Sequence, residues 1–188
     1  QLLPLEAWGK RYVAGQMKMA SANQYRVVSG EDGTQITTSP AIAGLNGKTL
    51  DAGKWVHVTA DKSFVLDATG PVQIVQFIAG SAMDMVDPSM TVLVPTQLFR
   101  NEYPLLVPTA YNENYANVVR QGQTPILVNG QQASATFSPI GDTGWEMANI
   151  PVTEGVHELT SEAPFGLIAY GFADFVSYAY PGGLSGAP

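Results

Sequence analysis

The stretch VPTQLFRNEY, residues 94–103, repeats the pattern of an earlier stretch, LPLEAWGKRY, residues 3–12. In each stretch an apolar residue and a proline come first, and a tyrosine, Tyr12 or Tyr103, follows eight residues after the proline. One bulky aromatic residue lies between the proline and the tyrosine in both stretches. Because self-similarity at a fixed spacing marks a repeated structural unit, these stretches predict that the chain makes one fold twice.

Further matches follow in the same order along the chain. At an offset of 91 residues, and later of 93, the matched pairs are Val27 with Val118, Ile36 with Leu127, Leu66 with Leu159, Pro71 with Pro164, and Phe77 with Tyr170. The alternative is that strand-rich chains resemble one another by composition alone. The repeat predicts two domains, residues 1–90 and residues 91–188, with a junction near Pro88–Val94, and each is long enough to fold alone.

Short strand-like runs dominate the chain. Residues 55–60, WVHVTA, alternate in side-chain direction as a strand requires, and Asn129-Gly130 after an apolar run predicts a two-residue hairpin turn. Short helical turns are expected at Leu5–Trp8 and Thr96–Arg100, each just after a proline. We expect strands over residues 10–15, 24–29, 34–38, 55–60, 63–68, 72–79, 90–94, 102–107, 115–121, 125–128, 133–138, 145–150, 156–161, 165–172 and 175–180. The predicted fold class is all-β, with two tandem antiparallel β-sandwich-like units.

Composition and charge exclude several kinds of partner. The formal net charge is −7, and seven of the nine Lys and Arg residues lie at or before Lys62, so the second half is distinctly acidic. Such a surface repels phosphate backbones, which argues against nucleic acid as a partner. No apolar run approaches the ~20 residues that cross a bilayer, which argues against membrane insertion. The absence of cysteine excludes disulfides and thiolate chemistry.

No catalytic group can be assembled from the sequence. The two histidines, His57 and His157, have no second potential ligand at the spacing of a metal site. The nucleophile motif G-x-S-x-G and the glycine-rich phosphate loops are absent. Asp84 and Asp87 flank a short loop, where a turn is favoured and a calcium ion is the alternative. We therefore predict no catalytic residue, no metal and no cofactor.

The segment between the strands predicted at 102–107 and 115–121 is the candidate contact site. Four of its residues suit recognition, because tyrosine rings offer rigid contact area and asparagine amides offer adaptable hydrogen bonds: Tyr111, Asn112, Asn114 and Tyr115. The alternative is that a tyrosine covers the core edge and the asparagines serve turns. The matching loop of the first unit, Gln16–Asn23, carries Met17 and Met19, which we expect to be exposed. If both loops lie at one end, that end is a contact surface.

Motifs along the whole chain point to one protein family. The earlier ones are QLLP, AWG and YV at residues 1–4, 7–9 and 12–13, LDAG at 50–53, DP and LVP at 87–88 and 93–95, and ILVNG at 126–130. The close is the most specific part, with EGVHEL, APFG, YGF and SYAYPGG at residues 154–159, 163–166, 170–172 and 177–183. These motifs resemble the N-terminal domain of IgGFc-binding protein, which occurs in animal mucus proteins and in large bacterial surface proteins.

The resemblance implies a location outside the cell or on its surface. The animal members carry cysteines, so a chain without cysteine resembles the bacterial members. It is similar to the later repeats of the domain, so an earlier repeat is expected before Gln1. Binding of an antibody constant region is not carried over, because no motif for that activity maps onto this sequence.

The leading functional prediction is a non-catalytic adhesion or recognition module of a larger secreted or cell-surface protein. Its partner would be a host-cell or prey surface protein, or a glycan, bound through loops on a rigid β scaffold. The alternative is a structural spacer that displays other modules, which the low charge and the repetition fit equally. An enzyme is not expected, and the fold alone does not separate these roles.

Overall fold

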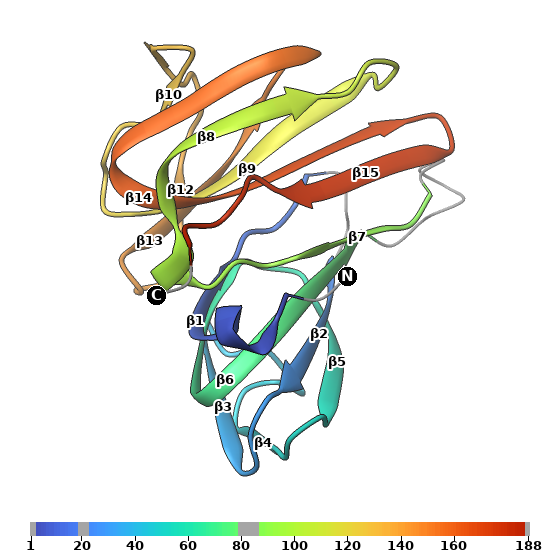
Figure 1. Ribbon diagram of the computed structural model, residues 1–188, viewed down its shortest axis with the longest axis vertical. Coiled ribbons are helices and arrows are strands. Elements are labelled where there is room, and N and C mark those ends of the chain that lie inside the picture. Colours follow the sequence, from blue (N-terminus) through green and yellow to red (C-terminus); the bar gives the residue numbers. More distant parts are fainter. Residues whose placement is uncertain (1–2, 19–22, 79–86, 187–188) are drawn as a thin grey trace.

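The computed structural model describes residues 3–18, 23–78 and 87–186, and the fold is all-β (Figure 1). Two antiparallel sheets contain the strands of these residues, and the helical segments among them are two 3₁₀ turns, η1 (Leu5–Ala7) and η2 (Thr96–Leu98). The predicted fold class and its short helical turns are therefore confirmed. No helix in the part of the chain that the structure describes is long and apolar enough to cross a membrane.

The two sheets share one connectivity. In the described residues, the first sheet contains β1 (Gly9–Ala14), β2 (Asn23–Ser29), β3 (Thr34–Ser39), β4 (Lys48–Leu50), β5 (Trp55–Ala60), β6 (Phe64–Ile78) and β7 (Ser89–Val92). The second contains β8 (Arg100–Val107), β9 (Glu113–Gln121), β10 (Leu127–Val128), β11 (Gln131–Gln132), β12 (Ser138–Pro139), β13 (Trp145–Pro151), β14 (Gly155–Ala173) and β15 (Val176–Pro181). The strand orders are β4-β3-β6-β2-β5 and β11-β10-β14-β9-β13-β12, with β1 and β7 on β6 and β8 and β15 on β14. The additional edge strand β12 is the difference between them.

The long strands β6 and β14 change partners halfway along. Before Pro71, β6 pairs with β1 and β3; after it, β6 pairs with β2 and β7, and one pair with β1 remains, Val72 with Gly9. Before Pro164, β14 pairs with β8 and β10; after it, β14 pairs with β9 and β15, and one pair with β8 remains, Phe165 with Arg100. The sequence predicts one strand before and a separate strand after each proline. In the structure, a single strand runs through each proline. A proline has no N–H to donate, and it is tolerated here because it falls where the ladder changes partners.

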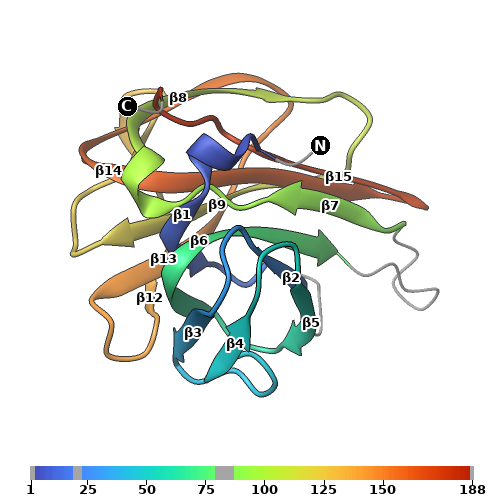
Figure 2. The same ribbon diagram turned by 60° about the horizontal axis from the view of Figure 1, so that its bottom comes forward.

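Both sheets are curled (Figure 2). Each has a core, and the two cores are in contact. The first core is built on Tyr12, Tyr25 and Phe64, and the second on Tyr103, Leu105 and Phe165. Side chains of the second sheet also join the first core, namely Tyr115, Ile168, Tyr170 and Phe172. A third cluster lies between the sheets and includes Val13, Leu98, Phe99, Val119 and Trp145. The two sheets are therefore packed on each other through apolar contact.

Some expectations differ from the structure. Residues 133–137 of the strand predicted at 133–138 are irregular, because their inward side chains pack on the second core while no neighbouring strand pairs with them before β12. Met17 is buried rather than exposed, at 1% exposure, because the chain after β1 turns inward; Met19 lies outside the described residues. The predicted boundary between residues 90 and 91 falls inside β7. The division into two domains stays a prediction.

Candidate functional site

The four predicted contact residues lie together, in and after the turn that joins β8 to β9. Tyr111 is half-buried and Asn112 is exposed in this turn. Asn114 and Tyr115 lie within β9 and are 7% and 5% exposed. The structure thus gives Tyr111 and Asn112 a surface that a partner can touch, while Asn114 and Tyr115 lie beneath it. A binding role for these residues stays a prediction.

Hydrogen bonds and ring contacts hold Tyr111 in place. The Asn114 side chain donates from Nδ2 to the Tyr111 carbonyl at 3.0 Å, and its Oδ1 accepts from the Tyr178 hydroxyl at 2.8 Å. The rings of Tyr111 and Tyr178 meet edge to face with centroids 4.7 Å apart, and Tyr180 stacks on Tyr178 at 5.9 Å. Asn114 therefore positions this tyrosine cluster. The sequence analysis missed Tyr178 and Tyr180, although their two-residue spacing puts both on one face of a strand.

The close packing of the tyrosine cluster requires Gly171. A Cβ on Gly171 would lie 2.5 Å from both Asn114 Oδ1 and Tyr178 Cε1, which is too close for either atom to remain where it is. Burial raises the pKa of Tyr178, so this hydroxyl keeps its proton and its donor role at neutral pH. The cluster is thus a rigid, neutral support for the turn above it.

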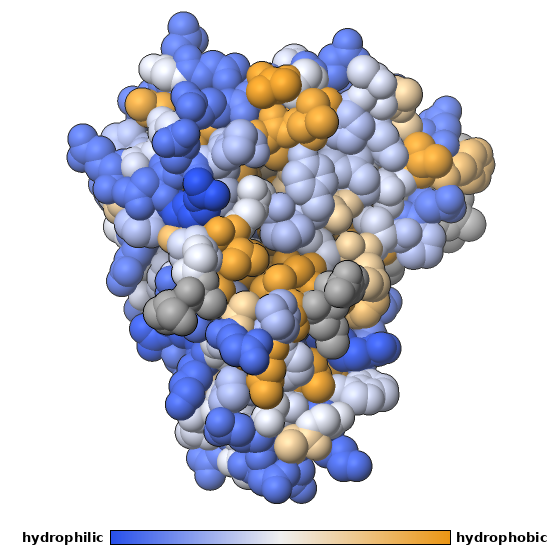
Figure 3. Space-filling model, in the orientation of Figure 1, coloured by the Kyte–Doolittle hydropathy of each residue, from blue (hydrophilic) through white to orange (hydrophobic). Residues whose placement is uncertain are grey.

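The β14–β15 hairpin extends the same end of the molecule (Figures 1 and 2). Its turn places Phe175 at φ +58° with 60% exposure, beside Val176 at 43%. The backbone amide of Asn112 donates to the Phe172 carbonyl at 3.0 Å, which connects the β8–β9 turn to this hairpin. Figure 3 shows apolar surface at this end. We call Tyr111, Asn112, Phe175 and Val176 the contact tip.

The sequence gives no signal for Phe175, since the hairpin turn alone sets its backbone conformation. Large side chains rarely adopt a positive φ, because Cβ then crowds the backbone. Residues held in such conformations cluster at functional sites. Its exposure together with this conformation makes Phe175 the residue of the contact tip that the fold explains least.

In the matching loop of the first unit, the described residues Gln16 to Lys18 contact the second sheet away from the contact tip. The Gln16 carbonyl accepts from Nδ2 of Asn117 at 3.2 Å and of Asn149 at 3.0 Å, on the outer face of β9 and β13. The Lys18 amide donates to the Tyr170 hydroxyl on β14 at 2.8 Å. These bonds attach the chain after β1 to the second sheet, so Gln16 and Lys18 hold the sheets together.

Tyr115 belongs to the contact between the sheets as well. Its hydroxyl donates to Glu113 Oε2 at 2.5 Å and accepts from Lys18 Nζ at 3.0 Å, and this ammonium lies 4.8 Å from the ring centroid. Burial, followed by the hydrogen bond to Glu113, raises the pKa of Tyr115. The hydrogen bond to Tyr115 raises the pKa of Lys18, so the Lys18 ammonium stays protonated at neutral pH. Tyr115 therefore contributes to the contact between the sheets.

Among the described residues, neither histidine belongs to a group of three or more potential metal ligands. The ring of His57 lies 6.0 Å from that of Phe77, centroid to centroid, and Nε2 of His157 contacts the Thr153 carbonyl at 2.8 Å. Within residues 3–18, 23–78 and 87–186, no three His, Asp or Glu side chains gather as a metal site would require. Asp84, one of the two candidate calcium ligands, lies outside the described residues.

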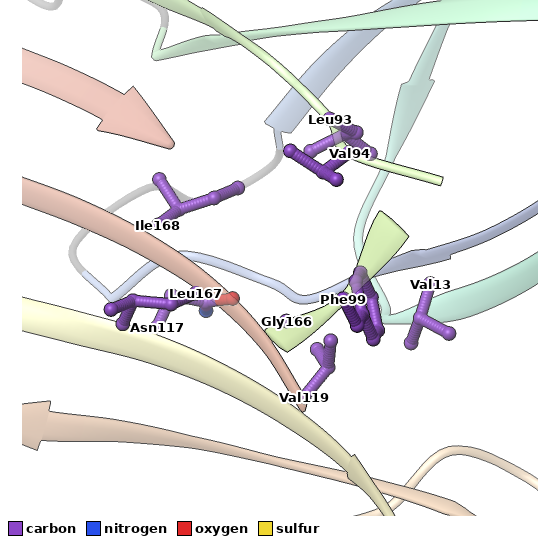
Figure 4. Close-up of a pocket in the computed structure, with 9 residues that line it drawn as sticks. All are labelled: Val13, Leu93, Val94, Phe99, Asn117, Val119, Gly166, Leu167 and Ile168. Carbon is purple, nitrogen blue, oxygen red and sulfur yellow. The ribbon is translucent and has the colours of Figure 1, made fainter. Parts of the chain in front are cut away.

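A small cavity lies between the two sheets (Figure 4). Apolar side chains line most of it, and Asn117 is its polar member. Its volume of about 20 Å³ holds one water molecule, because a water needs roughly 10–15 Å³. This cavity therefore cannot hold a substrate or a cofactor.

Comparison with known proteins yields one match. The chain matches the family model described as IgGFc binding protein over residues 1–171. No curated protein and no solved structure matches the chain. The matched range contains the first sheet and most of the second, including Tyr111 and Asn112, and it ends before Phe175. Since this match covers most of the residues, the chain belongs to the IgGFc binding protein family.

Proposed function

We propose that this chain is a non-catalytic adhesion or recognition module of a larger secreted or cell-surface protein, and that it binds through the contact tip. Membership of the family supports a binding role. The main support for binding through the contact tip is Phe175, a residue at φ +58° whose large apolar side chain is 60% exposed. Packing of the fold gives no reason to place an aromatic residue there.

The chemistry of the contact tip suits a partner with a broad surface. The rings of Tyr111 and Phe175 offer flat apolar area, and the Asn112 side chain offers an amide that both donates and accepts. Strands β9, β14 and β15 support all of them, so little conformational entropy is lost on binding. A protein or a glycan on a host or prey cell is the partner we propose, with a bacterial cell surface as the location of the module.

The test is a screen of the purified chain on protein and glycan arrays, followed by titration of each hit by biolayer interferometry. Phe175→Ala and Tyr111→Ala should each weaken the hit by about 10-fold or more, as truncation of an interface anchor does. Leu5→Ala is the matched control, because Leu5 is 53% exposed and lies in η1, away from the contact tip. It should change the affinity by less than about twofold. Retained affinity of both tip variants for every hit would contradict the proposal.

A structural spacer is the second candidate, and the contact between the sheets favours it. The bonds that join Gln16 to Asn117 and Asn149, and Lys18 to Tyr170, hold the two sheets in one relative position. Such a connection suits a rigid rod that displays other modules. A spacer would give no array hit, and its small-angle scattering curve would match that of a single rigid body.

A further inference from the structure

The outer faces of the two sheets differ in what covers them. On the second sheet, Asn117 and Tyr170 point away from their own core and contact the chain after β1. They are 2% and 0% exposed. On this face, an amide donor on β9 and a tyrosine on the adjacent strand β14 therefore bind the chain after β1.

The corresponding face of the first sheet is open. Cross-strand pairing places Arg26 opposite His57 on β5, and Gln24 opposite Phe77 on β6, so these side chains share one face with Trp55. Arg26 and Gln24 occupy the positions that Asn117 and Tyr115 occupy in the second sheet. Trp55 is 57% exposed, and Arg26 and His57 are also exposed. The face thus offers donors and rings to solvent.

Two aromatic rings hold Arg26 at the centre of this face. The guanidinium carbon lies 4.6 Å from the ring centroid of Trp55 and 5.5 Å from that of Phe77. The ion pairs among the described residues are Arg11 with Asp67 and Arg120 with Glu146, and neither involves Arg26. Ring contacts restrict the side chain, so its planar fork meets an oxyanion at a reduced cost in entropy. Arg26 is therefore suited to an anionic ligand.

We propose that this open face of β2, β5 and β6 binds an acidic saccharide, with its carboxylate or sulfate on Arg26 and its ring against Trp55. Charge selects an acidic ligand, because the outward positions of β2, of β5 and of the part of β6 after Pro71 hold Arg26 and no carboxylate. A sugar ring has an apolar C–H face that packs on an exposed indole. Gln24 and Thr59, on the same face, supply an amide and a hydroxyl for sugar hydroxyls. The site lies on the other sheet from the contact tip, so either proposal can fail alone.

The test is a microarray of sialylated, uronic-acid-containing and sulfated saccharides beside their neutral counterparts, probed with the whole chain. We expect binding to acidic saccharides and not to the neutral ones. Calorimetry of the strongest hit should show roughly 10- to 100-fold weaker binding for Arg26→Gln, because a charge-assisted hydrogen bond is lost. Arg26→Lys keeps the charge but not the planar guanidinium, so its affinity should lie between those of the original chain and of Arg26→Gln. Trp55→Ala should weaken binding about 10-fold.

Two controls separate this site from general charge and from the contact tip. Arg11→Gln removes another exposed arginine of the same sheet and should leave the affinity within about twofold, as should Phe175→Ala. Circular dichroism checks that each variant is folded. The proposal is overturned if no acidic saccharide binds, or if Arg26→Gln binds as well as the original chain. It is also overturned if a glutamate decapeptide binds as tightly as the best saccharide, because charge alone would then explain the binding.

Discussion

Tyr12 and Tyr103 form the same pair of hydrogen bonds at corresponding places in the two sheets. Each hydroxyl accepts from the backbone amide three residues before it and donates to a carbonyl of the long central strand, β6 or β14. The two side chains are 0% and 1% exposed. Together with the shared connectivity of the sheets, this equivalence supports the proposal that the chain contains two units of one fold.

Loss of either hydroxyl should therefore cost similar amounts of stability. We expect Tyr12→Phe and Tyr103→Phe each to lower the free energy of unfolding by about 1–3 kcal/mol, because a buried amide and a buried carbonyl lose their partner. Urea denaturation measures both values. Tyr111→Phe, on the surface, should change it by less than about 0.5 kcal/mol. A large loss for one buried tyrosine and none for the other would contradict the equivalence.

Gly15 lies close to Asn117 where the two sheets meet, so a side chain at residue 15 should not fit there. A Cβ at Gly15 would lie 2.3 Å from Asn117 Oδ1, so we expect Gly15→Ala to destabilise the chain by about 1–3 kcal/mol through overpacking. In the double variant with Asn117→Ala the clash disappears. A double-mutant cycle in urea should then show a coupling energy of about 1 kcal/mol or more. Simple additivity of the two changes would show that the sheets do not meet at this point.

Arg120 should stabilise the second unit far more than Arg11 stabilises the first. The Arg120 guanidinium bonds Glu146 Oε2 at 2.8 and 3.1 Å and the Thr124 carbonyl at 2.8 Å, and it lies 3.6 Å from the Phe137 ring centroid. Lysine cannot keep these contacts together, so Arg120→Lys should cost about 1–2 kcal/mol.

The matched control is Arg11→Lys, whose ion pair with Asp67 is largely solvated, with side chains 56% and 46% exposed. It should cost about 0–1 kcal/mol. Thermal unfolding of both variants measures the difference. Equal midpoints for the two variants would refute the structural role given to Arg120.

The buried tyrosines should make the protein unfold at alkaline pH. Burial raises the pKa of Tyr12, Tyr25 and Tyr170 above the ordinary value of 10.0. Their folded-state pKa exceeds the unfolded value, so this stability is complete below pH 10 and is lost as the pH rises towards the folded pKa. The slope is about 1.4 kcal/mol per pH unit for each tyrosine. The phenolate absorbance of these three tyrosines should therefore rise together with loss of the circular dichroism signal; ionisation of these three near pH 10 in a folded chain would contradict this.

Phe175 should be dispensable for folding. Asparagine tolerates a positive φ better than phenylalanine does, so Phe175→Asn should leave the free energy of unfolding unchanged or raise it by up to about 1 kcal/mol. Phe172→Ala, at a 4% exposed position three residues earlier, should cost about 3–5 kcal/mol. Thermal unfolding measures both. A large loss for Phe175→Asn would mean that this ring serves packing and would remove the main support for the contact tip.

Sequence reasoning located most strands and turns because those signals are local. The alternation in residues 55–60 corresponds to β5, and Asn129 and Gly130 adopt φ of +53° and +77° as a two-residue hairpin requires. The candidate site was only partly predictable. Asn114 and Tyr115 are of the same residue types as Asn112 and Tyr111, which they follow closely. No local pattern shows that β9 buries Asn114 and Tyr115.

The sequence by itself determined the all-β class, the positions of the turns and the matching places of Tyr12 and Tyr103. These follow from side-chain period and backbone preference, which act over a few residues. Only the tertiary structure decided which face of each sheet is covered. Asn117 is buried and Arg26 is exposed at corresponding positions, because the chain after β1 packs on the second sheet and leaves the first open. Burial depends on segments distant in sequence, which no local pattern contains.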